Sequence, residues 1–316
     1  MPRSRAILVV IGTCLFALAA MPGCGSNIPD PTGPVPGEER PGGIGSTGDR
    51  GENAFNHAAT NLNDEELSRF AVGNSFFRQN WVTAPASTEG RDGLGPLFNA
   101  RSCTGCHLRD GRGSPSEDPK ATTGFLVRLG ITGPDPLGPD LPHPVYGSQL
   151  QPFALLGITA EGQVRITHTP VPGMFGDGTA YELQRPAYTF EELGYGPMGD
   201  VLYSPRVAQQ LAGMGLLEAI TEANLAENRV IDAATGETVV GRFGWKANEP
   251  TVRQQVAAAF NGDIGITSSL FPQDHCTAPQ SACNSAPNGN GLGETHELKA
   301  RTLDLVAFYT ATLGVA

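Results

Sequence analysis

The strongest constraint on this chain is a single Cys-x-x-Cys-His, formed by Cys103, Cys106 and His107. Covalent attachment of haem requires two thiols at this spacing to bond the vinyl groups, and a histidine immediately afterwards to bind the iron. Thr104 and Gly105, between the cysteines, are small enough to lie under the ring. The motif therefore predicts one covalently bound haem c, with His107 as the proximal ligand of the iron.

Two other chemistries use the same cysteines. A thioredoxin-type dithiol also contains Cys-x-x-Cys, but the sequence around it does not resemble the βαβ unit of that fold. Alternatively, Cys276 and Cys283 complete a four-ligand zinc site with Cys103 and Cys106. In an oxidising compartment, two leftover cysteines this close in sequence most simply form a disulfide. We expect Cys276 and Cys283 to be bonded to each other, with a role in stability.

The first 24 residues have the pattern of an export signal. Arg3 and Arg5 precede an apolar run, residues 6–20, that is too short to span a bilayer comfortably. An Ala-x-Ala site allows ordinary cleavage after Ala19, whereas MPGC, ending at Cys24, is similar to the lipobox of bacterial lipoproteins. We expect an exported protein, either periplasmic or anchored to the membrane by a lipid at Cys24.

Composition and charge set the remaining boundaries. Residues 25–54 are rich in proline and glycine, which predicts a tether, and residues 55–316 are expected to form one haem-bearing domain. The formal net charge of −11 opposes binding to nucleic acid and to anionic lipid head groups. We therefore expect no nucleic-acid partner and no membrane contact beyond the lipid anchor. A small basic redox protein is a suitable partner for such a surface.

Apolar periodicity predicts mostly helices. The expected fold is mainly α with a small β portion and long loops. Glycine (41 residues) and proline (26 residues) are both frequent, which favours the long loops. Helices are expected over residues 62–82, 206–220, 249–260 and 295–313 and through the cysteine motif, and strands over residues 125–131 and 163–171.

Segments beyond the motif carry a family resemblance. WVTAPASTEGRDGLGPLFNARSCTGCHLRDGRG (81–113), GRFGWKA (241–247) and AAAFNGDIGITSSLFP (257–272) resemble the bacterial di-haem oxidoreductases, often labelled thiol oxidoreductases or peroxidases. The likeness covers roughly residues 55–316. That family is similar to the di-haem cytochrome c peroxidases. The resemblance therefore implies a cytochrome-c-like haem domain elaborated by long loops, and redox chemistry at haem iron.

The chain departs from that family in one respect. Members continue into a second Cys-x-x-Cys-His, whereas this sequence contains only the first. We expect the second haem domain to be absent, and turnover by this chain alone to be lost with it. The missing half is then a separately encoded partner. The alternative is a one-haem electron carrier or binding module without catalysis.

Further residues are candidates for holding the haem. Haem propionates bind guanidinium and ammonium groups, and candidates of this kind flank the motif or lie in GRFGWKA. The GRFGWKA segment also contains an indole that is able to contact the propionates or to conduct electrons. The alternatives are solvated charges and, for the indole, a buried core residue. The sixth ligand of the iron stays open among several sulfur and imidazole side chains. The propionate candidates are Arg101, Arg109, Arg112, Arg242, Trp245 and Lys246, and the ligand candidates are Met174, Met198, Met214 and His168.

Overall fold

A computed structural model describes residues 36–316 except residues 89, 115–123, 134–140, 226–228 and 292. The chain divides into two units, Met1–Glu38 and Glu39–Ala316. The expected export signal and the lipidation site at Cys24 lie outside the described residues. The division falls inside the expected tether, residues 25–54, and part of that range packs within the larger unit, where the Thr47 N–H donates to the Val315 carbonyl over 2.8 Å. The larger unit is described below.

Two long helices of this unit cross each other closely. Helix α1 (Asp64–Arg78) begins at a capping box, in which Asn63 and Glu66 each bond the other's backbone N–H. Helix α5 (Ala300–Ala311) packs against α1, and Gly73 lies at the crossing. A Cβ at Gly73 would lie 2.2 Å from the Leu305 carbonyl oxygen, so only glycine allows this approach.

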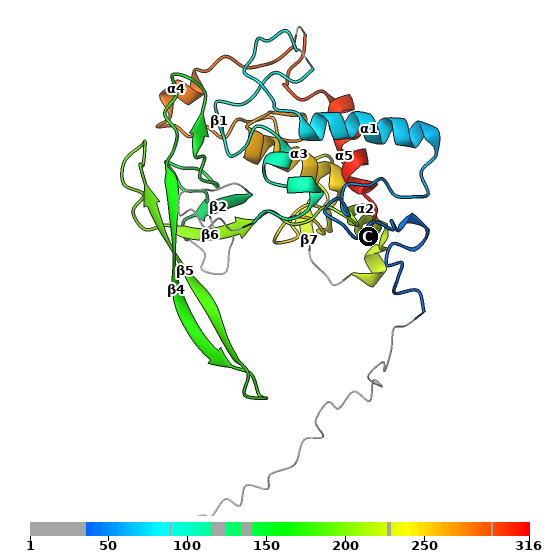
Figure 1. Cartoon of the computed structure of the whole chain (residues 1–316). Coiled ribbons are helices and arrows are strands. Elements are labelled where there is room, and N and C mark those ends of the chain that lie inside the picture. Colours follow the sequence, from blue (N-terminus) through cyan, green and yellow to red (C-terminus); the bar gives the residue numbers. More distant parts are fainter. Residues whose placement is uncertain (1–35, 89, 115–123, 134–140, 226–228, 292) are drawn as a thin grey trace, which may run out of the picture. The chain divides into compact units, whose positions relative to one another are not determined.

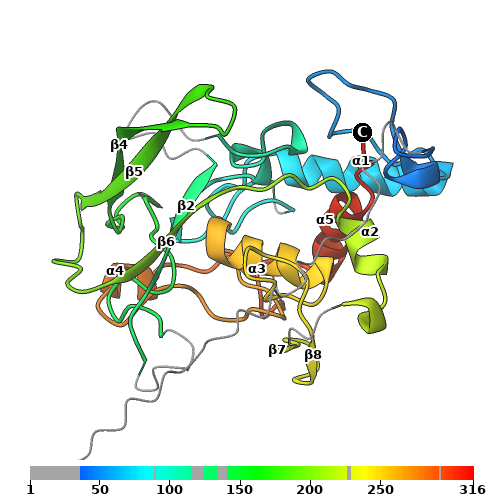
Figure 2. The same cartoon turned by 90° about the horizontal axis from the view of Figure 1, so that it is seen from below.

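The main hydrophobic core fills the space between these helices and α3 (Val252–Ile264). Phe77 and Tyr309 have ring centroids 5.1 Å apart, and Trp81 meets Phe260 edge to face at 5.3 Å. Helix α2 (Met214–Ala219) contacts α3 and α5, and the short α4 (Ser281–Asn284) lies apart from these four helices in both views (Figures 1 and 2). The core combines these aromatic rings with leucine, isoleucine and valine side chains.

Among the described residues, the strands form four two-stranded antiparallel sheets. The longest is a ribbon whose outer half, residues 167–187, is mostly exposed and extends away from the helices (Figure 1). No helix that the structure describes has the length and apolar character needed to cross a membrane. The pairs are β1 (Leu97–Phe98) with β3 (Phe153–Ala154), β2 (Phe125–Gly130) with β6 (Leu202–Val207), β4 (Gln163–Met174) with β5 (Ala180–Glu191), and β7 (Arg229–Ile231) with β8 (Thr238–Val240).

The β2–β6 sheet separates a second core from the candidate site. Phe125, Val127 and Leu129 alternate along β2 and are buried in the second core, together with Tyr146 and Met198. Because successive side chains of a strand point to opposite faces, the residues between them face the other way. That opposite face forms part of the wall of the cavity described below.

The expectation of a mainly α fold is wrong. The described residues are 24% helical and 22% strand. The largest error is over residues 206–220, where the only α-helix is six residues long, because Arg206 and Val207 belong to β6 and Gly213 has a φ of +85° that an α-helix does not accept. The cysteine motif is a 3-10 turn rather than part of a longer helix. The expected strands are present as β2 and β4.

Candidate functional site

The cysteine motif faces a cavity of about 250 Å³. Cys103, Cys106 and His107 all line it. The remaining wall comes from β2, β6 and the segment after β6, from helices α3 and α5, and from the loop that carries Trp245. The three residues of the motif therefore share one concave surface with elements that are distant in sequence.

A tight turn holds the two cysteines. The Cys103 carbonyl accepts the N–H of Cys106 at 3.1 Å and that of His107 at 2.8 Å. Both thiols are free, and burial raises the pKa of Cys106 to about 11 and that of Cys103 further. Asp263, on the cavity wall, adds to both increases. The thiols are consequently protonated at neutral pH, which is unlike the lowered pKa of a reactive dithiol.

The imidazole of His107 is oriented by a backbone acceptor. Its Nδ1–H donates to the Gln209 carbonyl over 2.7 Å, which leaves the lone pair of Nε2 available. Burial lowers the pKa of His107, so the ring is neutral at pH 7. A neutral imidazole whose other nitrogen is fixed by a carbonyl is the usual state of a histidine that binds a metal.

A buried hydrogen bond between Asp110 and Tyr309 fixes the turn after His107. Arg109 and Asp110 both have positive φ, 53° and 60°, which is strained for residues with a Cβ. The Asp110 carboxylate is 1% exposed and accepts the hydroxyl of Tyr309 on α5 over 2.7 Å. Burial is the main cause of the raised pKa of Asp110. Helix α5 thus holds the backbone that follows the histidine.

The four arginines expected to bind propionates lie elsewhere. Arg109 forms an exposed ion pair with Glu52 at 2.7 Å, and Arg101 lies over the ring of Phe98 at 6.0 Å. Arg242 donates to the carbonyls that end α2, including that of Glu218 at 2.8 Å. Arg112 donates to the Gln210 side chain over 2.7 Å. None of these four arginines is among the residues that line the cavity.

Other cationic side chains line the cavity. Lys246 and Trp245 line the cavity, and Trp245 is 56% exposed, so the alternative of a buried indole is wrong. Arg128 on β2 and Arg206 on β6 also line it, and sequence reasoning missed both. The alternation of FLVRLG indicates that Arg128 is on the face opposite the buried Phe125, Val127 and Leu129. The helix expected over residues 206–220 gives no indication that Arg206 lies beside β2.

The candidates for the sixth ligand are scattered. Met174 is 68% exposed near the end of the β4–β5 ribbon, and His168 is exposed on the same ribbon. Met198 is buried in the second core. Of these candidates only Met214 lines the cavity, where it also packs against the main core.

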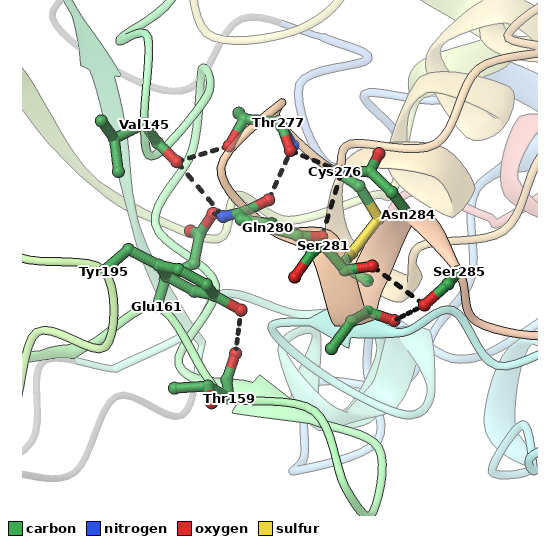
Figure 3. Close-up of a disulfide and its surroundings, with 12 residues drawn as sticks. Val145, Thr159, Glu161, Tyr195, Cys276, Thr277, Gln280, Ser281, Asn284 and Ser285 are labelled. Carbon is green, nitrogen blue, oxygen red and sulfur yellow. Dashed lines mark hydrogen bonds between the residues drawn. A yellow bond between two sulfur atoms is a disulfide. The ribbon is translucent and has the colours of Figure 1, made fainter.

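The other two cysteines form a disulfide away from the cavity wall. Cys276 and Cys283 have Cα atoms 5.7 Å apart, and they flank the loop that leads into α4 (Figure 3). Because they are bonded to each other, they do not act as zinc ligands. No group of three or more His, Cys, Asp or Glu side chains within the described ranges is arranged to hold a metal ion.

A buried carboxylate lies beside this loop. Glu161 is 1% exposed and lies beside Gln280, whose amide N–H it accepts over 2.6 Å (Figure 3). It also accepts the backbone N–H of Gln151 over 2.7 Å. Gln151 in turn donates to the carbonyl of Gly262, next to Asp263 on the cavity wall. A hydrogen-bonded path therefore links the disulfide loop to the wall of the site.

The family comparison agrees with this site. The sequence profile of the family described as "di-haem oxidoreductase, putative peroxidase" matches residues 37–128 and 195–316. The chain therefore belongs to the di-haem oxidoreductase family. The matched segments contain the cysteine motif, both arginines of the cavity wall and the GRFGWKA loop, while the β4–β5 ribbon lies in the unmatched stretch. Comparison with curated proteins finds no match, and neither does comparison with solved structures.

Proposed function

We propose that this chain is an exported c-type haem protein that transfers electrons through one covalently bound haem. Membership of the di-haem oxidoreductase family supports a haem-dependent redox function. The observation that carries the proposal is that two free thiols and a neutral imidazole line the same cavity. The chain contains this motif once, so we expect one haem per chain.

The donor set fits haem c. Cys103 and Cys106 would form the two thioether bonds, and Nε2 of His107 would bind the iron. Gln209 holds the imidazole in the required tautomer through its carbonyl. When bound, haem iron exchanges single electrons with a donor or acceptor.

Export and the choice of partner follow from the same proposal, because haem c is attached outside the cytoplasm. The amino-terminal sequence supports export, with either lipidation at Cys24 or ordinary signal cleavage. The net charge of −11 favours a small basic redox protein as partner. A second haem domain is the other partner that we propose, because the family name specifies two haems.

Haem staining after expression in a periplasm with haem-attachment machinery tests the proposal. The wild-type band should stain after denaturation, and its haem should resist extraction with acidic acetone. Cys103→Ala combined with Cys106→Ala should abolish both properties. Cys276→Ala combined with Cys283→Ala is the matched control and should leave staining intact. Haem that extracts freely from the wild-type protein would refute covalent attachment.

A further inference from the structure

Two arginines on the cavity wall form a pair of like charges. Strands β2 and β6 are antiparallel with Leu126 opposite Arg206 and Arg128 opposite Ser204, so both guanidinium groups project from the same face of the sheet. Both side chains are partly buried and line the cavity. Burial lowers the pKa of Arg206, and the nearby Arg128 lowers it further.

This arrangement has an electrostatic cost. Like charges that lie close together and partly out of water repel each other. Within the described part of the chain, neither arginine has a carboxylate within ion-pair distance, and Arg206 has only a weak contact with the Ser204 hydroxyl, at 3.4 Å. An anion between the two guanidinium groups would remove the repulsion.

The other charged groups of the cavity wall are Lys246, Glu249 and Asp263, whereas the His107 ring and the two cysteine thiols are neutral. Asp263 already accepts the amide of Gln149 over 2.8 Å and acts on the cysteines. Arg128 lowers the pKa of Glu249, but burial has the larger, opposite effect. Glu249 and Asp263 therefore do not neutralise the positive charge of the arginine pair.

We propose that Arg128 and Arg206 form a clamp for the carboxylates of the bound haem, its two propionates. This inference rests on the proposed function, because the same cavity contains the haem-binding motif. A propionate accepts two parallel N–H bonds from a guanidinium group, which fixes its position as well as its charge. The sheet supplies both guanidinium groups on one rigid surface, so the clamp is formed before the haem arrives.

Redox titration of the haem-loaded protein between pH 5 and pH 9 tests the clamp. Arg128→Gln and Arg206→Gln should each lower the ratio of reduced to oxidised haem at fixed applied potential, by about threefold or more, because a positive charge near the iron is lost. The potential should also become pH-dependent, since an unpaired propionate titrates nearer neutrality. Arg185→Gln, on the exposed ribbon, is the matched control and should match wild type.

The conservative variants separate the clamp from a structural role. Arg128→Lys and Arg206→Lys keep the charge, and each should retain most of the wild-type potential and its pH profile. If haem is attached but both glutamine variants titrate like Arg185→Gln, the clamp is wrong and the haem function stands. If lysine and glutamine variants shift the potential equally, the charge is irrelevant and the clamp is again refuted. A wild-type protein without haem would overturn both proposals.

Discussion

The buried carboxylate of Glu161 should make this protein less stable as the pH rises. It is 1% exposed, and burial raises its pKa from 4.5 to about 8, although Gln280 and the backbone of Gln151 both donate to it. The folded state therefore holds a proton that the unfolded state releases between pH 4.5 and pH 8. Stability from this group is fully present below pH 4.5 and is lost as the pH rises through about 8.

The size of the effect follows from the same two pKa values. Each pH unit within the window costs ~1.4 kcal/mol of unfolding free energy. Between pH 5 and pH 8 the loss should reach about 3 kcal/mol, an order-of-magnitude value. Other groups titrate in this range, so the contribution of the Glu161 carboxyl is obtained from the difference in unfolding free energy between wild type and Glu161→Gln.

Urea unfolding of both proteins at pH 5, 6, 7 and 8 measures that difference. Glu161→Gln should be less stable than wild type at pH 5, because a glutamine presents an N–H to one of the two donors around it. The difference in unfolding free energy between the two proteins should narrow by about 3 kcal/mol toward pH 8, because the wild-type carboxylate is then increasingly ionised in a buried position. Glu222→Gln, which removes an exposed carboxylate, should stay parallel to wild type. Parallel curves for wild type and Glu161→Gln would refute the reasoning.

Three further changes test the packing around the site. Gly73→Ala should destabilise by roughly 2 kcal/mol or more in thermal unfolding, although alanine is the better helix former, because α5 blocks the new methyl group; a stabilised variant would contradict the close crossing. Tyr309→Phe should cost about 1–3 kcal/mol by leaving the buried Asp110 without its donor, and an unchanged melting temperature would argue against that bond. Replacing Cys276 and Cys283 by serine should cost about 2–3 kcal/mol by the loop-entropy estimate, and mass spectrometry that finds two free thiols in the unreduced protein would overturn the disulfide.

The sequence alone determined the features that depend on near neighbours. The helix at Asp64–Arg78 follows from a cap at Asn63 and acids in its first turn, which act within four residues. The strand at Phe125–Gly130 follows from apolar alternation. The cysteine motif likewise needs no distant residue to be recognised, because the chemistry of attachment fixes its spacing.

Tertiary structure decided the fold class and most of the site. Residues 206–220 have an apolar pattern that suits a helix, but pairing with β2 makes a strand of Arg206 and brings it beside Arg128. The contact between Asp110 and Tyr309 joins residues 199 positions apart. The burial of Glu161 likewise depends on a loop more than a hundred residues away. Local periodicity contains no information on such contacts, since strand pairing and burial are set by segments that meet only when the chain folds.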